Sequence, residues 1–364
     1  MALDAQKVLV AMSGGVDSSV AAKLLTDAGF SCVGCTMKLY ENEDAGITKE
    51  NTCCSLDDIE DARSVAFRLH MPYYVFNLKE QFSECVIDRF VAAYACGITP
   101  NPCIDCNRYL KFDKLFARAD VLGCRYIATG HYARIEKQDG RYVLKKALDE
   151  SKDQSYVLYD LTQEKLARVQ FPLGALKKSQ ARQIAEDAGL INARKHDSQD
   201  ICFVPDGDYA AVIARRTGSV PQPGPFLDLA GNVIGTHRGI IHYTVGQRRG
   251  LRMAAGEKIY VVRIDPARNA VIVGPDEALY TAKCYVPAMH WIAGQAPALP
   301  LRCCAKTRYR QTEQPCTVYP AEGGGVRLVF DAPLRAITPG QSAVLYDGDM
   351  VLGGGVIARE ETEC

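Results

Sequence analysis

The stretch 13–19 near the start of the chain has the residue types that bind phosphate. Its sequence, SGGVDSS, lies between an apolar run and an amphipathic run. Two glycines let a backbone turn its N–H groups inward as an anion nest, and a following helix adds its dipole and serine hydroxyls. The residue order differs from both the GxxxxGK[ST] and the GxGxxG loops. A tight strand–helix turn without a ligand is the alternative, but the features together predict a phosphate-binding loop of another type.

Cysteine is the second residue type that could carry chemistry. Of the 15 cysteines, Cys103 and Cys106 have a C-x-x-C spacing within residues 97–107 (GITPNPCIDCN). Cys202 lies far downstream, in residues 197–203 (DSQDICF). A thiolate is both a nucleophile and a ligand for soft metals. A small buried hydrophobe is the alternative for each of these cysteines taken alone.

The elements that must position these groups follow a βα pattern over the first 200 residues. Short apolar runs alternate with amphipathic segments, which is typical of a parallel sheet with helices on its faces. The pattern predicts strands at 7–12, 31–37, 73–78 and 125–129, and helices that end near 28, 70, 96 and 122, the second with Ser55 as N-cap. Residues 97–107 are predicted to form a loop between helices, because two prolines disfavour a helix there. Asp139-Gly140 predicts a hairpin.

The pattern changes near residue 205. A short helix predicted at 208–217 precedes the proline-rich stretch 221–225, and the rest of the chain consists of short β-rich runs separated by Gly, Pro and Asp. The length of 364 residues also exceeds that of one hydrophobic core. We therefore predict an α/β chain with a Rossmann-like parallel-sheet catalytic domain at 1–204, a small β-rich central domain at 205–275 and a C-terminal β-barrel at 276–364.

Composition narrows the class of protein. The content of 48% hydrophobic and 24% charged residues is ordinary for a soluble globular protein. No apolar stretch has the length of a membrane-spanning helix and the first residues lack signal-peptide character, so we expect a cytoplasmic protein whose cysteines form no structural disulfides. The 43 Lys and Arg balance the 43 Asp and Glu. This balance disfavours a protein that coats nucleic acid over its whole surface and is compatible with a local basic face.

The motifs resemble those of a known enzyme family. The loop SGGVDS is similar to that of the pyrophosphatase-loop family of ATP-dependent adenylating enzymes, whose fold is adenine nucleotide alpha hydrolase-like. The TPNPxxxCN stretch that ends at Asn107 and the ICF stretch at Cys202 resemble the signature of bacterial tRNA-specific 2-thiouridylases. Further matching stretches, in order, are ATGHY at 128–132, KDQSY at 152–156, YTVGQRR at 243–249, KTRYRQT at 306–312 and TPGQS at 338–342. The resemblance covers the chain from Val8 to Gly355.

This resemblance implies ATP-dependent 2-thiolation of the wobble uridine in Lys, Glu and Gln tRNAs. The C2 oxygen of uridine is a poor leaving group, and transfer of AMP to it lets sulfur attack C2. The implied ATP contacts are Ala11, Met12, Ser13, Gly14, Gly15, Val16, Asp17, Ser18, Met37 and Gly130, with Asp17 helping to bind Mg²⁺. The implied tRNA contacts are Asn101, Pro102, Cys103, His131, Lys152, Asp153, Gln154, Arg308, Tyr309 and Gln341.

The resemblance also assigns roles to the cysteines. Cys202 receives sulfur as a persulfide, and Cys106 is the partner nucleophile that closes a Cys106–Cys202 disulfide as sulfur is released. The sulfur donor is a cysteine desulfurase, a relay protein or free sulfide. Many family members carry aspartate where this chain has Cys103. Cys103, Cys106 and Cys202 could therefore hold a [4Fe–4S] cluster with one open iron; a persulfide relay with Cys103 as a spare thiol, and zinc or neither, are the alternatives.

Basic residues gather in two places in the β-rich half, namely Arg248, Arg249 and Arg252, and then Lys306, Arg308 and Arg310. Tyr309 between two arginines suits pairing with an RNA backbone and stacking on a base, although a solvated charged face is the simpler interpretation. Two other functions stay open. Another pyrophosphatase-loop ligase should lack the TPNPxxxCN stretch and the distant cysteine, and a redox-sensing RNA-binding protein with structural cysteines would act without ATP.

Overall fold

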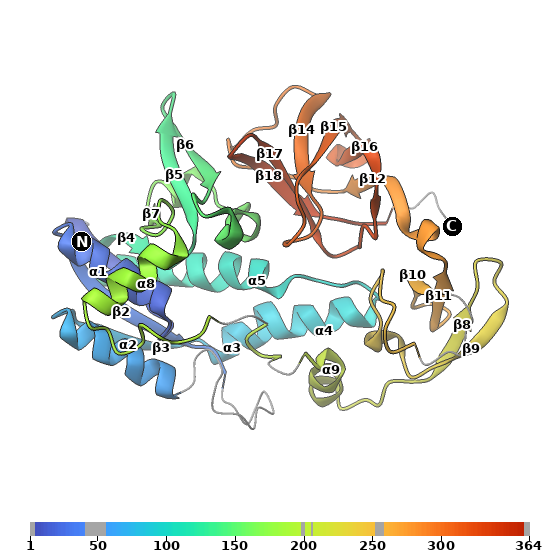
Figure 1. The fold of residues 1–364 in the computed structure, drawn as a ribbon, viewed down its shortest axis with the longest axis horizontal. Helices are drawn as coiled ribbons and strands as arrows, with labels where there is room; N and C mark the ends of the chain where they lie inside the picture. The colour runs from blue at the N-terminus through green and yellow to red at the C-terminus, as the bar shows by residue number, and fades with distance from the viewer. Residues whose placement is uncertain (1–3, 41–55, 198–200, 205–206, 252–257, 360–364) are drawn as a thin grey trace.

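The computed structural model describes residues 4–40, 56–197, 201–204, 207–251 and 258–359, and these residues form three sheets (Figure 1). The first sheet is parallel, in the order β3-β2-β1-β4-β7. Its strands are β1 (Asp4–Ala11), β2 (Ser31–Lys38), β3 (Tyr73–Asn77), β4 (Cys124–Ala128) and β7 (Val169–Gln170). The prediction of a parallel sheet in the first 200 residues is confirmed.

Helices cover both faces of the parallel sheet. Along β1, Val8 and Val10 pack into one core cluster and Leu9 into another, because successive side chains of a strand point to opposite faces. The helices α1 (Val16–Asp27), α2 (Leu56–Arg68) and α8 (Lys178–Asp187) cover the Val8 face, and α6 (Leu115–Val121) covers the Leu9 face. Ser55, the predicted N-cap of α2, lies outside the described residues.

Two longer helical stretches run from the parallel sheet towards the C-terminal half (Figure 1). The first consists of α3 (Lys79–Phe82), the π-helical η1 (Ser83–Ile87) and α4 (Asp88–Ala95). The second consists of α5 (Pro102–Asp105), the π-helical η2 (Cys106–Lys114) and α6. A π-helical turn within a helix often marks a functional site.

The prediction of a loop over all of 97–107 is wrong in its second half. Pro102 takes the first helical position, where its missing N–H is not needed. Asn101 is the N-cap, and its Oδ1 accepts a hydrogen bond from the N–H of Cys103 at 3.2 Å. Cys103 and Cys106 therefore lie on a helix.

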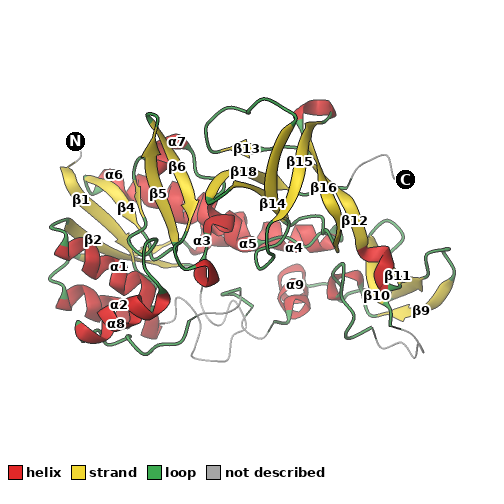
Figure 2. Ribbon diagram, turned by 45° about the horizontal axis from the view of Figure 1, so that its top comes forward, coloured by secondary structure: helices red, strands yellow, loops and turns green. Residues whose placement is uncertain are grey.

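A β-hairpin connects the parallel sheet to the C-terminal sheet. It consists of β5 (Ala133–Gln138) and β6 (Arg141–Lys146), and its turn residues Asp139 and Gly140 have φ of 49° and 79°, as predicted for this pair. Lys145 in β6 pairs with Met350, so the hairpin extends the C-terminal sheet (Figure 2). The chain then passes through η3 (Glu150–Lys152), η4 (Ser155–Leu158) and α7 (Gln163–Leu166).

The second sheet lies in the middle of the chain. It follows α9 (Tyr209–Thr217), whose N-cap Asp208 accepts a hydrogen bond from the N–H of Ala211 at 3.0 Å. Its strands, in the order β10-β11-β8-β9, are β8 (Gly224–Leu227), β9 (Val233–His237), β10 (Tyr260–Asp265) and β11 (Ala270–Gly274), with η5 (Ile240–His242) between β9 and β10. Phe226, Val261 and Val271 lie in its own small core.

The third sheet forms the C-terminal barrel-like domain. Besides β5 and β6, its strands are β12 (Tyr280–Val286), β13 (His290–Trp291), β14 (Leu301–Lys306), β15 (Gln314–Pro320), β16 (Val326–Arg335), β17 (Ser342–Asp347) and β18 (Met350–Val356), with η6 (Asp276–Leu279) and η7 (Glu322–Gly324). The predicted α/β fold class, with β-rich middle and C-terminal parts, is confirmed. No helix in the described ranges is long and apolar enough to cross a membrane.

Candidate active site

The predicted phosphate loop lies at the carboxyl end of β1, where the chain enters α1. Gly14 has a φ of 74°, and a Cβ at this position would lie 2.4 Å from the main-chain oxygen of Asp58. The hydroxyls of Ser18 and Ser19 each donate to the main-chain oxygen of Gly15 at 3.1 Å. The N–H groups of the first turn of α1 have no partner within the helix, so the loop suits an anion.

Asp17 lies in a network of charges beside this loop. Its Oδ1 accepts hydrogen bonds from the Tyr132 hydroxyl at 2.8 Å and from Lys178 Nζ at 2.7 Å. Lys178 Nζ also lies 2.8 Å from Asp197 Oδ1, although the lysine is only 9% exposed. A buried ammonium group requires compensating charge, and the two carboxylates provide it.

Asp197 is held by three basic side chains. Besides Lys178, Lys152 lies at 2.8 Å and Arg182 at 2.9 Å from its carboxylate. Burial on its own raises the pKa of Asp197, but the hydrogen bonds from Lys152 and Lys178 outweigh it and lower the pKa to about 2. Asp197 directly precedes the segment that leads to Cys202.

Lys178 was missed by the sequence reasoning. It occupies the first helical position of α8, where a positive charge opposes the helix dipole. A lysine in that position was the available signal, because an unfavourable local placement needs a reason elsewhere. Asn192, which donates to the loop at Gly14, was missed as well.

The other two predicted nucleotide contacts lie at the ends of β4 and β2, the two strands that flank β1. Gly130 follows β4, and a Cβ there would lie 2.7 Å from the main-chain nitrogen of Ser18. Only glycine therefore allows the end of β4 this close to α1. Met37 lies near the end of β2, half-buried against the cores on either side of the Cys106 helix. Met12 is buried and accepts a hydrogen bond at its main-chain oxygen from Thr36 Oγ1 at 2.6 Å.

His131 connects the phosphate loop to the cysteine helix. Its neighbours Gly130 and Tyr132 touch α1 and Asp17, while its ring lies 6.3 Å from the ring of Phe112 on the Cys106 helix. His131 is buried, and its Nδ1 is 2.7 Å from Thr129 Oγ1. Burial, followed by the nearby charge of Lys111, lowers the pKa of His131 well below its usual value. The imidazole is therefore neutral at pH 7.

Cys106 and Cys202 pack into the same hydrophobic cluster. Cys106 is buried there, and half-buried Cys202 packs against the cluster next to Phe203. The Tyr40 hydroxyl donates to the main-chain oxygen of Cys202 at 2.8 Å. The structure thus places two cysteines that are far apart in the sequence against one hydrophobic cluster, and all twelve described cysteines are present as thiols.

The three candidate iron ligands do not gather in the described structure. Cys103 is exposed on the first turn of α5, whereas Cys106 is buried. Among the described His, Cys, Asp and Glu residues, no group of three or more is placed to hold a metal ion. As they stand, Cys103, Cys106 and Cys202 do not fit a three-thiolate cluster site.

Lys111 is a further residue that the sequence reasoning did not single out. It lies five positions after Cys106 in the π-helical segment η2, where i and i+5 are one turn apart. Burial raises the pKa of Cys106 to about 11, and the Lys111 charge opposes this rise. The same charge acts on His131. One cation therefore lies near both the candidate nucleophile and the histidine.

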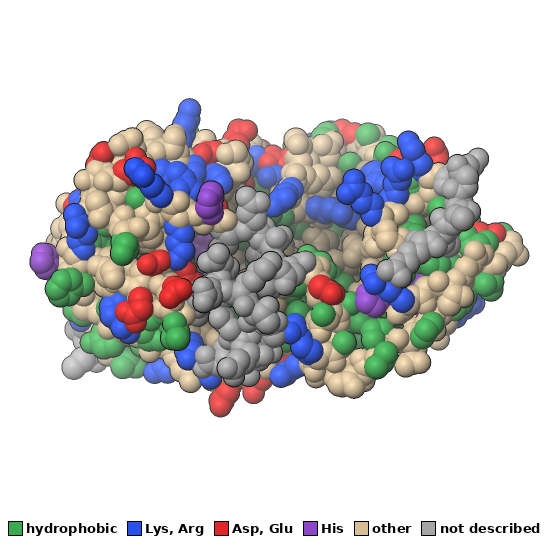
Figure 3. Space-filling model, turned by 60° about the horizontal axis from the view of Figure 1, so that its bottom comes forward, with side chains coloured by type: hydrophobic (Ala, Val, Ile, Leu, Met, Phe, Trp, Pro, Cys, Tyr) green, Lys and Arg blue, Asp and Glu red, His purple; other side chains and the backbone are tan. Residues whose placement is uncertain are grey.

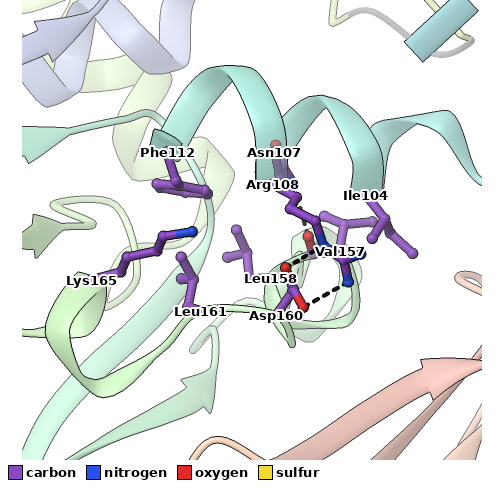
Figure 4. A pocket seen from close by; sticks show the side chains of 9 residues that line it. All are labelled: Ile104, Asn107, Arg108, Phe112, Val157, Leu158, Asp160, Leu161 and Lys165. Carbon is purple, nitrogen blue, oxygen red and sulfur yellow. Dashed lines mark hydrogen bonds and ion pairs between the residues drawn. The ribbon is translucent and has the colours of Figure 1, made fainter. Parts of the chain in front are cut away.

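A small recess lies behind the cysteine helix (Figure 4). Arg108 and Asp160 form a two-pronged ion pair at its edge, with Nη2 to Oδ1 at 2.6 Å. The cavity volume is about 10 Å³, which is the lower limit for one water molecule. This recess is too small for a nucleotide, and the ion pair at its edge holds the helix against residues 157–161.

Most of the predicted tRNA contacts make contacts within the protein. Asp153 accepts hydrogen bonds from the N–H of Ala147 and from Ser155, and Gln154 Oε1 accepts from the N–H of Tyr132 at 2.9 Å. Pro102 is buried, and Lys152 is paired with Asp197.

Arg308 of the second basic cluster lies where the middle part of the chain meets the barrel. Arg308 Nη2 donates to the main-chain oxygens of Val245 at 3.1 Å and Ala336 at 2.9 Å, which joins the middle part of the chain to the barrel. Tyr309 is partly exposed, and burial followed by the charges of Asp153 and Cys103 raises its pKa. Figure 3 shows lysine and arginine side chains along the upper part of one face, on both its left and its right half. Arg252 lies outside the described residues.

Comparison with known proteins agrees with this architecture. Residues 6–206 match a family model described as tRNA methyl transferase HUP domain, residues 212–275 its PRC-barrel domain, and residues 281–357 an aminomethyltransferase beta-barrel domain. The tRNA-specific 2-thiouridylase MnmA of Symbiobacterium thermophilum is 50% identical over 98% of this chain and 93% of that protein. The proteins of the same name from Acetivibrio thermocellus and Clostridioides difficile are 49% and 45% identical, each over 97% of this chain and 99% and 98% of the relative. This chain belongs to the tRNA-specific 2-thiouridylase family.

Proposed function

We propose that this chain replaces the C2 oxygen of the wobble uridine of tRNA with sulfur, using ATP. The observation that carries the proposal is that one short segment, residues 130–132, contacts both the phosphate loop and the helix of Cys106. Gly130 and Tyr132 touch the phosphate loop, and His131 between them lies against the helix that carries Cys106. A base held near His131 would therefore have ATP on one side and a thiol on the other.

In the first step, the uridine C2 oxygen attacks the α-phosphate of ATP and releases pyrophosphate. The N–H groups at the start of α1 bind the leaving phosphates. Mg²⁺ fits here because Asp17 and Asp197 already share one cation, Lys178, and phosphate oxygens would complete its preferred oxygen ligands. Neutral His131 can donate or accept one hydrogen bond at the base.

In the second step, sulfur displaces AMP. A persulfide on Cys202 attacks C2, AMP leaves, and the base is joined to Cys202 through two sulfurs. The Cys106 thiolate then attacks the sulfur of Cys202, which releases 2-thiouridine and leaves a Cys106–Cys202 disulfide. The shared hydrophobic cluster of the two cysteines favours this relay over a three-cysteine iron site.

The substitutions Cys106→Ala and Cys202→Ala test the relay. Each should abolish the formation of 2-thiouridine, measured by retardation of tRNA in a mercury-containing gel, while tRNA binding stays near wild type. Cys85→Ala is the matched control, because Cys85 packs half-buried against the same cluster. Wild-type thiolation in either of the first two variants would contradict the assigned roles.

Iron and acid-labile sulfide in protein purified without oxygen decide between the relay and a cluster. About four irons per chain, with absorbance near 400 nm, would establish a cluster and overturn the relay. Cys103→Asp provides the second arm, since it supplies the acid found in many relatives and removes one candidate iron ligand. Thiolation retained in that variant supports the relay.

The substrate and donor follow from the same proposal. We propose Lys, Glu and Gln tRNAs as substrates, with contacts from Asn101, Cys103, Lys152, Arg308, Tyr309 and Gln341. A cysteine desulfurase or a relay protein supplies persulfide sulfur to Cys202, whereas free sulfide, which cannot form that persulfide without an oxidant, would be the donor only by direct attack on the activated C2. Thiolation assays with each purified tRNA and each donor distinguish these cases.

A further inference from the structure

We propose that Asn192 is a positioning residue of the ATP loop, whose side-chain amide holds the main-chain oxygen of Gly14 away from the phosphates. The inference rests on the proposed use of ATP at this loop. It adds a residue outside residues 11–18 that determines how well the loop binds nucleotide.

The contact joins two segments that are 178 residues apart in the chain. Asn192 Nδ2 donates to the main-chain oxygen of Gly14 at 2.9 Å and lies 2.8 Å from Ser19 Oγ. Asn192 is 3% exposed, so water does not compete for these bonds. The amide thus bridges the loop and the first turn of α1.

The direction of the Gly14 carbonyl matters because an anion nest presents N–H groups and excludes carbonyl oxygens. Gly14 has a φ of 74°, a left-handed conformation that glycine adopts readily and that changes the direction of the flanking peptide groups. The Gly15 oxygen is already held by the hydroxyls of Ser18 and Ser19. Asn192 does the same for the Gly14 oxygen, so the carbonyls of both glycines have donors on the protein side.

The orientation of the amide is fixed by its surroundings. The opposite orientation would place Oδ1 against the Gly14 oxygen, two acceptors in contact. As it stands, Oδ1 is buried without a hydrogen-bond partner in the described part of the chain. A buried unpaired acceptor costs stability. Asparagine at this position therefore destabilises the fold through its unpaired Oδ1 while its Nδ2 makes two hydrogen bonds. We take this combination to indicate a role at the loop.

A neighbouring residue supports the loop from its other side. Lys195 Nζ lies 2.7 Å from Asp58 Oδ1 and 2.5 Å from Asp61 Oδ2 in α2. The backbone of Asp58 is the group that packs against Gly14. Residues 192–195 thus fix α2 against the loop and fix the loop carbonyl itself.

Asn192→Leu is the test, because leucine keeps the approximate shape and removes both the donor and the unpaired acceptor. Affinity is measured with a non-hydrolysable ATP analogue, and KM is measured separately for ATP and for tRNA during thiolation. We expect the ATP affinity to fall and the KM for ATP to rise roughly five- to tenfold, as for the loss of about one net hydrogen bond. The KM for tRNA should stay near wild type, because the substitution acts at the ATP loop.

The controls separate this role from a structural one. Arg194→Met lies in the same segment with a side chain that is 92% exposed, and it should change neither KM. Partial unfolding of Asn192→Leu would lower the rate per total enzyme and leave both KM values unchanged. A rise in the KM for ATP relative to the KM for tRNA therefore reports the loop and not unfolding. Asn192→Asp, which places an acceptor beside the Gly14 oxygen, should weaken ATP binding at least as much.

Wild-type affinity for the ATP analogue in both Asn192 variants would overturn the inference. Failure of the wild-type chain to thiolate tRNA, with ATP binding and the Asn192 effect intact, would instead remove the proposed function and leave the positioning role standing. Absence of ATP binding in the wild-type chain would overturn both.

Discussion

Gln341 in the C-terminal barrel donates a hydrogen bond from Nε2 to the main-chain oxygen of Thr99 at 2.8 Å, across 242 residues of sequence. Thr99 begins the stretch that leads to Cys103 and Cys106. Its N–H donates in return to the main-chain oxygen of Pro339 at 3.1 Å. The barrel therefore holds the entrance to the cysteine helix, and Gln341 has a structural contact besides the tRNA contact that we propose for it.

Gln341→Leu should lower the rate of thiolation at saturating substrates by about tenfold, because the cysteine helix loses one fixed end and effective placement of reacting groups is sensitive to small shifts. The KM for ATP should not change, since the phosphate loop lies on other elements. Single-turnover thiolation measures the effect. Gln314→Leu is the control, because the Gln314 side chain donates to the main-chain oxygen of Thr312 in its own turn. An equal loss in both variants would show general damage to the barrel.

Lys178→Met should weaken ATP binding and lower the unfolding temperature. Removing the ammonium group leaves Asp17 and Asp197 close together without the cation that they share, and a buried charge without its partner is costly. Added Mg²⁺ should recover part of the stability in Lys178→Met and little in wild type, as measured by thermal unfolding with and without Mg²⁺. Equal responses to Mg²⁺ would show that the carboxylates do not share a cation site.

His131 should make the protein less stable in mild acid. Its pKa in the folded state lies well below the unfolded value of about 6.5. Below pH 6.5 the unfolded chain binds a proton that the folded chain does not, so stability is complete above that pH and falls as pH decreases. The slope from this residue is at most about 1.4 kcal/mol per pH unit. Urea unfolding between pH 7.5 and 5 should show a shallower loss in His131→Gln.

Much of the fold was predictable because its local signals agree with its tertiary structure. Asp139-Gly140 specified its hairpin. The alternation of short apolar runs, such as Val8 to Val10, with amphipathic segments specified a parallel sheet with helices on both faces. The prediction of a loop over 97–107 was wrong in its second half because a proline such as Pro102 can begin a helix as well as prevent one. The domain division at 204 and 275 stays a prediction, and the pairing of Lys145 with Met350 across it leaves no local trace in the sequence.

The candidate site divides in the same way. The phosphate loop and the cysteines carry their chemistry in short motifs, so residue types and spacing revealed them. Lys178 and Asn192 reach the loop from more than 160 residues away and belong to no motif that identifies them. Such residues are identified only through their contacts, although a lysine at the start of a helix opposes the helix dipole and so indicates a partner elsewhere.

Lys111 should be needed for the sulfur step. Its charge opposes the burial that raises the pKa of Cys106 to about 11, and a thiol with such a pKa is almost fully protonated at pH 7. Lys111→Met should therefore reduce the rate of thiolation by at least tenfold, while Lys111→Arg retains most of it because the charge remains. Lys114→Met is the matched control, since Lys114 is exposed on the same helical segment. ATP affinity should be unchanged in all three variants. If Lys111→Met and Lys114→Met were equally active, the charge beside Cys106 would have no part in activating the thiol.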